Sequence, residues 1–196
     1  MERDHVPPAN LFEKPRPDNL ITRPICSVCH RPTSADDEGF RLFVTSYITR
    51  NDAAARLWQR KVVPNTLRRG RIRPFVQKVR ASFEPVVIKV GSAELPVGTF
   101  RVDRAPIDRV LIRITKGLYS VSAPHIDSRL FKFNINLIDP FQLPRRISFV
   151  SEMFNHLTLG DQVYDCWWAL ASEDVRHGVW VHMFFRSVAF AVYHSV

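Results

Sequence analysis

The apolar positions in the second half of the chain recur with two different periods. Between Ile107 and Leu118 they fall at i, i+3, i+4, i+7 and i+11, which is the spacing of one helix face. Between Phe131 and Leu137 every second residue is apolar and the residues between are Lys or Asn, which predicts a half-buried strand. This half of the chain is therefore expected to hold both a helix and a sheet.

Aromatic and β-branched residues dominate the C-terminal end and predict further strands. The turn at 172–178 should join two of them as an antiparallel hairpin. Upstream, two short strands are expected around turns at Gly91 and 96–98, and a helix is expected after Pro144. The ranges are Tyr164–Leu170, Val179–Phe185 and Val188–Tyr193 for the aromatic strands, Val86–Ile88 and Thr99–Val102 for the short ones, and Ile147–Leu157 for the helix.

The first 50 residues show a different series, in which a loop, a strand, a turn and a helix follow one another. Four prolines between 6 and 18 predict an extended loop. The run 19–25 is a candidate strand, and Cys26–Cys29 is the turn after it. A helix should start at Thr33 or Ser34, with Asp36 and Asp37 as approximate capping-box partners and apolar residues at 40, 43 and 47.

A second helix, expected from Asn51 through Trp58 towards Pro64, opens the basic part of the chain. The 196 residues carry a net charge of +9, and 53–83 holds nine basic residues and no acidic one. Such residues can simply cover a solvated helix face. A run of one sign this long favours contact with nucleic acid, ahead of an acidic membrane. The predicted contacts are Arg56, Arg60, Lys61, Arg68, Arg69, Arg71, Arg73, Lys78 and Arg80.

Several features argue against other classes of protein. No apolar run is long enough to span a membrane, and charges and prolines stand where a signal peptide would need an apolar segment. Three cysteines, two of them in a Cys-x-x-Cys pair, do not form a disulfide framework. We expect a cytoplasmic protein with no membrane partner. The sequence leaves the oligomeric state open.

The residues at the front of the chain have the chemistry of a small metal site that cleaves phosphodiesters. Asp4 offers a carboxylate to a divalent ion, and His5 offers a base with a pKa near neutrality. His30 can complete the metal shell, and the Asn19 amide can tie the intervening loop through hydrogen bonds. Because neighbouring side chains on a strand point to opposite faces, Asp4 and His5 need a bend to meet one phosphate, which the prolines at 7 and 8 could supply.

These residues resemble the HNH, or ββα-metal, nucleases. The resemblance lies in Asp4-His5, Asn19-Leu-Ile and Cys26-x-x-Cys29-His30, followed by a helix. Wider stretches, Asp4 to Phe12 and Asp36 to Phe43 among them, are similar to a group of uncharacterised bacterial HNH-type proteins. The resemblance implies that Asp4 and His30 bind Mg²⁺, Mn²⁺ or another divalent ion. It also implies that His5 is the general base and that Asn19 fixes the loop.

One departure from the family concerns zinc. Members with this Cys-x-x-Cys usually carry a second pair upstream, and the four thiolates hold a structural ion. Here three residues precede Asp4 and none is Cys, so the sequence is truncated or the motif has decayed. The knuckle is incomplete, and Zn²⁺ at Cys26 and Cys29 is in doubt. Cys166 is better explained as a small buried apolar residue.

The patterns and the resemblance together predict an α+β protein. It should have an N-terminal ββα-metal-like motif (1–50), a basic helical segment (51–83) and an α+β domain ending in aromatic strands (84–196), whose antiparallel sheet has helices packed on it. The five other histidines and the Trp167-Trp168 pair are expected to be structural or surface residues.

Three functions remain open from the sequence. The first is metal-dependent hydrolysis of nucleic acid, with DNA as the expected substrate. The second is non-catalytic nucleic-acid binding on a decayed HNH scaffold. The third is a protein-interaction module, which an exposed apolar patch around Trp168 and Trp180 would favour.

Overall fold

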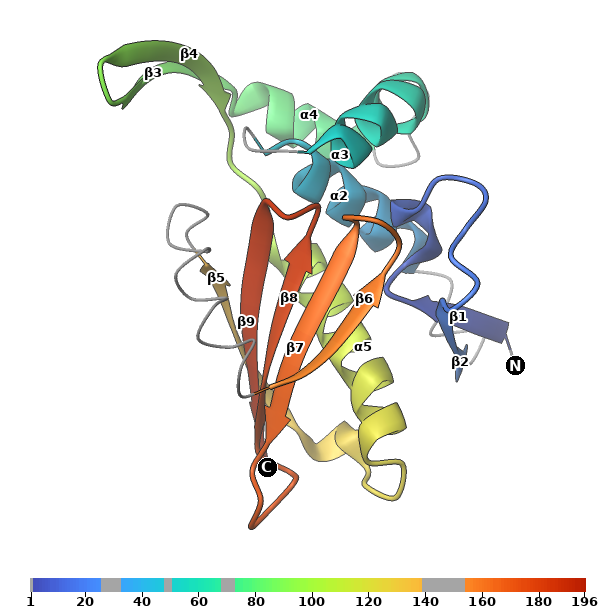
Figure 1. Cartoon of the computed structure of the whole chain (residues 1–196). Helices are drawn as coiled ribbons and strands as arrows, with labels where there is room; N and C mark the ends of the chain where they lie inside the picture. The colour runs from blue at the N-terminus through green and yellow to red at the C-terminus, as the bar shows by residue number, and fades with distance from the viewer. Residues whose placement is uncertain (1, 26–32, 48–50, 68–72, 139–153) are drawn as a thin grey trace.

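A computed structural model describes residues 2–25, 33–47, 51–67, 73–138 and 154–196. It begins with an antiparallel hairpin of β1 (Glu2–Val6) and β2 (Ile21–Ile25), with the short helical turn η1 (Ala9–Leu11) in the connection. Helix α2 (Thr33–Thr45) follows (Figure 1). The predicted loop, strand and helix are thus confirmed in that order, while the turn at Cys26–Cys29 lies outside the described residues.

The helical middle is also confirmed. Helix α3 (Asp52–Leu57) is capped by Asn51, whose side-chain oxygen accepts the Ala54 N–H at 3.0 Å. The chain continues as the wider π-helical segment η2 (Trp58–Leu67), and α4 (Arg73–Ala81) comes next. Val76 of α4 packs with Leu42 and Val62, so α4 is held against α2 and η2.

Strands β3 (Glu84–Val90) and β4 (Ala93–Thr99) form a two-stranded arm that projects from the rest of the protein (Figure 1). The turn at Gly91 is confirmed, but two sequence predictions were wrong. Residues 96–98 lie within β4 instead of forming a turn, and of the strand predicted at Thr99–Val102 only Thr99 belongs to β4, which ends there. A two-stranded arm can hold Pro96 because each strand has one unpaired edge, where a missing N–H costs no ladder hydrogen bond.

The C-terminal half is built on helix α5 (Arg104–Ser122) and a five-stranded antiparallel sheet in the order β5-β9-β8-β7-β6. The short turn η3 (Ser128–Leu130) leads into β5. The strands are β5 (Lys132–Ile138), β6 (Asn155–Leu159), β7 (Tyr164–Leu170), β8 (Gly178–Phe184) and β9 (Val188–Ser195).

The helix predicted at Ile147–Leu157 was wrong at its end, because Asn155 to Leu159 form β6. Leu157 pairs with Cys166 of β7, so this segment completes the sheet edge beside an aromatic strand. Residues 139–153 lie outside the described residues. The α+β class, with a C-terminal antiparallel sheet and helices in the middle, is confirmed.

The main core lies between one face of the sheet and helices α2 and α5. From α5 it takes Ile107, Val110, Leu111, Ile114 and Leu118, the residues that the helical spacing singled out. From α2 it takes Phe40, whose ring meets that of Phe184 edge-on at 4.9 Å. Residues of β1, η1 and α3 join the same core. In the described part of the chain, no helix is both long and apolar enough to cross a membrane.

A chain of hydrogen bonds crosses this core and fixes the tautomer of His182. The Thr115 hydroxyl donates to the Leu111 carbonyl at 2.9 Å, so it must accept from His182 Nε2, also at 2.9 Å. His182 Nδ1 is then the acceptor for the Tyr164 hydroxyl at 2.8 Å. Burial lowers the pKa of His182 to about 3, which keeps the ring neutral. This histidine is structural, as expected from the sequence.

The aromatic residues of the sheet serve packing. Trp180 is fully buried, stacks on Trp168 with ring centroids 5.6 Å apart, and donates its indole N–H to His194 Nδ1. The exposed patch that would have favoured an interaction module is therefore absent at Trp168 and Trp180. Cys166 is buried as predicted, and burial raises the pKa of its thiol to about 12.

Candidate active site

Hairpin β1–β2 lies against helix α5 and turns one of its faces towards that helix. Asp4 and Val6 are buried on this face, while His5 is only partly buried and sits across from Thr22. Gly117 of α5 permits the contact, since a Cβ atom there would come within 2.6 Å of Val6 Cγ2. Pairing of β1 with β2 stays regular to Val6, so Asp4 and His5 point to opposite faces. The sequence predicted a bend that would bring Asp4 and His5 to one face, but regular pairing continues to Val6, so any bend at the prolines comes too late to do this.

Asp4 is held on both carboxylate oxygens. Its Oδ1 accepts the backbone N–H of His5 at 3.0 Å. Its Oδ2 lies 3.1 Å from Nε of Arg113, an ion pair without the alignment of a hydrogen bond. Both side chains are largely shielded from water, so this pair is less screened than a surface ion pair.

Helix α2 brings a second carboxylate to the same guanidinium. Asp37 Oδ1 accepts a hydrogen bond from Arg113 Nη2. Burial raises the pKa of Asp37 to about 6, although Arg113 opposes the shift. Asp4 and Asp37 therefore face one shared cationic position, supplied by α5.

Asp36, one residue earlier, binds a different arginine. Its two oxygens accept from Arg109 at 2.8 and 2.7 Å. Asp36 and Asp37 were expected to help cap α2, whose N-terminal flank lies outside the described residues, and their carboxylates bind two arginines that lie one turn apart on α5. The structure thus adds Asp37 and Arg113 to the candidate site. The only sequence signal was the i, i+4 spacing of Arg109 and Arg113, which does not indicate the carboxylate that each arginine binds.

His5 is suited to accept a proton. Burial and the nearby positive charge of Arg16 lower its pKa, and Asp4 opposes this only in part. The imidazole is therefore largely neutral at pH 7. Asn19 is exposed, and its side chain forms no hydrogen bond within the described ranges. The Leu20 N–H closes this turn on the Pro17 carbonyl at 3.3 Å, and the described residues show no loop-fixing bond from Asn19 of the kind expected.

Only some of the residues that could bind a metal ion belong to the described part of the chain. Cys26, Cys29 and His30 lie outside the described residues. Within the described part of the chain, no three His, Cys, Asp or Glu side chains gather as a metal site. The two carboxylates that share Arg113, Asp4 and Asp37, are hard oxygen donors of the type that Mg²⁺ and Mn²⁺ prefer. Their chemical type suits such an ion, and His30 would have to complete its set of ligands.

The predicted nucleic-acid-binding residues fall into two described groups. Arg56 and Arg60 share the carboxylate of Glu13 at 3.3 and 3.4 Å, and Lys61 donates to the Phe12 carbonyl at 2.9 Å. These three side chains hold the N-terminal loop against the helical segment, in addition to any external role. Lys78 and Arg80 are exposed on α4. Arg68, Arg69 and Arg71 lie outside the described residues, and Arg73 begins α4.

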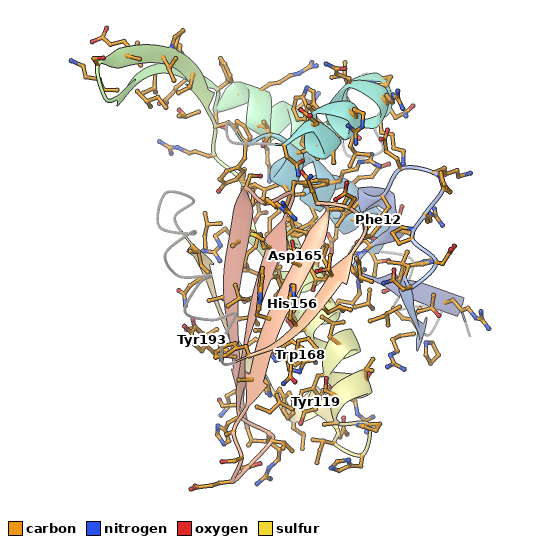
Figure 2. All side chains as sticks on the ribbon, viewed as in Figure 1. Phe12, Tyr119, His156, Asp165, Trp168 and Tyr193 are labelled. Carbon is orange, nitrogen blue, oxygen red and sulfur yellow. The ribbon has the colours of Figure 1, made fainter. Side chains whose placement is uncertain are left out.

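A second pair of titratable groups lies away from the hairpin, on the other face of the sheet. His156 Nε2 of β6 is 3.4 Å from Asp165 Oδ1 of β7, and the two residues lie side by side in Figure 2. Asp165 also accepts from Thr158 at 2.7 Å, and the His156 ring stacks on Trp167 at 4.6 Å. These contacts account for the polar groups of the pair, which supports a structural role.

Comparisons of the chain with protein-family models, with curated proteins and with solved structures find no match.

Proposed function

We propose that this protein hydrolyses phosphodiester bonds of nucleic acid, DNA in the first place, as a metal-dependent nuclease of the HNH type. The observation that carries the proposal is the convergence of Asp4 and Asp37 on one cationic position, at a strand whose other face carries His5 with a lowered pKa. The order of hairpin and helix around these residues supports it as well.

In this proposal each residue has one role. His5 takes a proton from the attacking water, and its lowered pKa keeps the imidazole in the unprotonated form that can do so. Asp4 and Asp37, together with His30, would hold Mg²⁺, Mn²⁺ or another divalent ion. When bound, such an ion stabilises the charge that develops on the phosphate and on the leaving oxygen.

The substrate has to reach two faces of one strand. Asp4 and His5 lie on opposite sides of β1, and among the described strands only β2 pairs with β1, which leaves the other edge of β1 unpaired there. In this proposal a phosphate at that edge meets His5 directly, and the buried Asp4 would act on it through the ion that it holds. A bulky duplex has less access to such an edge than a flexible strand has.

A plasmid-nicking assay tests the proposal. Supercoiled DNA is incubated with wild type and with His5→Ala, in Mg²⁺, in Mn²⁺ and in EDTA. Loss of the general base should slow nicking by about 10²–10⁴-fold, and EDTA should abolish it. His156→Ala removes an exposed histidine outside the site and is the matched control. Equal background nicking by wild type and His5→Ala would exclude catalysis.

The second candidate function is non-catalytic nucleic-acid binding on the same scaffold. It is favoured by the exposed Lys78 and Arg80 on α4, a helix whose residues include no acidic side chain. It predicts salt-dependent binding that survives His5→Ala. Charge reversal at Lys78 and Arg80 should weaken binding and lower the salt slope by about 1 for each phosphate that is no longer neutralised. Binding that does not respond to salt would contradict it.

We place this function in the cytoplasm, where the cysteine pair stays reduced. Only two of the four ligands of a structural Zn²⁺ are present in the Cys26 and Cys29 pair, so we do not assign zinc a role.

A further inference from the structure

A hollow of about 430 Å³ lies between hairpin β1–β2 and helix α5. Its hairpin side is lined by Asp4, Arg23, Pro24 and Ile25, and its helix side by Arg113 and Lys116. This volume falls within the range of about 300–1,000 Å³ that is typical of small-molecule sites. The hollow borders the candidate active site through Asp4.

The charges around the hollow leave two cations without a carboxylate. Arg113 is already bound by Asp4 and Asp37. Arg23 lies across the hairpin from Asp4 and points to the same face, yet its Nε is buried and has no hydrogen-bond partner within the described residues. Lys116 forms no ion pair there and extends over the Phe133 ring at 5.4 Å. An anion is the ligand that these two side chains lack, and phosphate matches the planar guanidinium in particular.

Apart from Ser120, the rest of the wall is apolar. Pro24 and the partly buried Ile25 continue the hairpin side of the hollow beyond Arg23. An apolar surface beside two cations suits a ligand that joins a phosphate to a flat or apolar group. A nucleotide has this composition, with a sugar and base attached to each phosphate.

We propose that this hollow binds one nucleotide of a nucleic-acid strand, with its phosphate on Arg23 and Lys116 and its sugar and base against Pro24 and Ile25. The proposal rests on the proposed function, because it makes the hollow the subsite next to the phosphodiester at Asp4. A base in the hollow has left the base stack, which costs least in a single strand. The protein therefore prefers single-stranded over duplex substrate.

Binding in EDTA tests this inference without cleavage. A fluorescein-labelled thymidine hexamer is titrated with wild type, Arg23→Gln and Lys116→Gln, and fluorescence anisotropy gives the Kd. We expect Arg23→Gln to weaken binding at least tenfold and Lys116→Gln at least threefold. Arg101→Gln is the matched control, because it removes the same charge from an exposed position between β4 and α5 that does not line the hollow, and it should change Kd less than twofold. Circular dichroism verifies that each variant is folded.

Competition experiments separate the strand from other sources of phosphate. Unlabelled dinucleotide TpT should displace the hexamer at a concentration at least tenfold below that of inorganic phosphate, and duplex of the same length should bind more weakly than the single strand. Equal effects of Arg23→Gln and Arg101→Gln would overturn the inference. So would equal competition by TpT and inorganic phosphate, since that would indicate an anion site without a place for the base.

The inference and the proposed function can fail separately. His5→Ala should bind the hexamer like wild type. If the nicking assay shows no difference for His5→Ala while Arg23→Gln still weakens hexamer binding, the catalytic proposal fails and the nucleotide subsite stands. If nicking depends on His5 but Arg23→Gln binds normally, the reverse holds.

Discussion

Arg113 Nε on α5 lies 3.1 Å from Asp4 Oδ2 on β1, and the same guanidinium is hydrogen-bonded to Asp37 on α2. One arginine thus connects the hairpin, the helix that follows it and the central helix of the fold. Four residues earlier, Arg109 donates to both oxygens of the single carboxylate of Asp36 and is far more exposed than Arg113. The two arginines offer a direct comparison of a shielded and an exposed ion pair.

We expect Arg113→Gln to destabilise the protein much more than Arg109→Gln. Removing Arg113 leaves two shielded carboxylates without their cation, which costs about 3 kcal/mol by analogy with other buried pairs. Arg109 is an exposed partner, for which a loss of about 0.5 kcal/mol is typical. Guanidinium unfolding of the two variants and wild type measures the difference. Equal losses would mean that the Arg113 cluster is no more stabilising than a surface ion pair.

The contact between Gly117 and Val6 predicts an unusual result for a substitution in a helix. Gly→Ala inside a helix normally stabilises by about 1 kcal/mol. Here the new Cβ would lie 2.6 Å from Val6 Cγ2, and a β-branched side chain has little freedom to move away. We expect Gly117→Ala to destabilise by about 1–3 kcal/mol, as overpacking does.

A double-mutant cycle with Val6→Ala identifies the source of this loss. In the Val6→Ala background, Gly117→Ala should become neutral or stabilising, because the clashing methyl groups are gone. Ser122→Ala, near the exposed end of α5, is a control for the generic effect of alanine in this helix. A Gly117→Ala protein as stable as wild type would show that the hairpin moves away at no cost.

The sequence predicted those elements whose burial pattern is set locally. Helix α5 and strands β7 to β9 were found because their apolar residues repeat with the period of the element. Strand β6 was mistaken for a helix because its pattern is short, and only pairing with β7 decides its conformation. The end of β4 was misjudged because Pro96 normally breaks strands, and the sequence does not reveal that the arm has free edges.

The candidate site was predictable in part for the same reason. Asp4 and His5 stood out through their spacing from the cysteine pair, which is a local signal. The partnership of Asp37 with Arg113 spans 76 residues and depends on how α2 packs on α5, so no local pattern contains it. The opposite orientation of Asp4 and His5 follows from strand pairing up to Val6, which the prolines at 7 and 8 do not interrupt.

The buried His182 predicts a particular dependence of stability on pH. Burial lowers its pKa from about 6.5 in the unfolded chain to about 3 in the native protein. Between these values the unfolded state binds a proton that the native state does not, so stability falls as pH drops below about 6.5, by about 1.4 kcal/mol per pH unit. Between pH 7.5 and 5 the expected loss from this group is about 2 kcal/mol.

The variant His182→Gln isolates this contribution. Asp37 has a raised pKa and acts in the opposite direction, becoming more favourable in the native state as pH falls, but it is present in both proteins. The loss of stability between pH 7.5 and 5 should therefore be about 2 kcal/mol smaller in His182→Gln than in wild type, as measured by urea unfolding. The same loss in both proteins would mean that His182 is protonated in the native core.

The arm of β3 and β4 should open far more readily than the sheet. Its strands contact each other but bury little against the rest of the protein, and Val87 is 59% exposed. A two-stranded hairpin without packing on either face is only marginally stable. Native-state hydrogen exchange should show weak protection for Ile88 and Leu95, with opening free energies of about 1–2 kcal/mol. Strand β8, which has a neighbour on each side, should exchange only by opening close to the global unfolding free energy.

Addition of a thymidine hexamer provides a further comparison, because the nucleotide hollow lies on α5 and the hairpin β1–β2, away from the arm. If the hexamer raises amide protection in β1 and β2 and leaves it low in the arm, the result fits that location. If protection rises mainly in the arm, the hexamer binds to β3 and β4 instead.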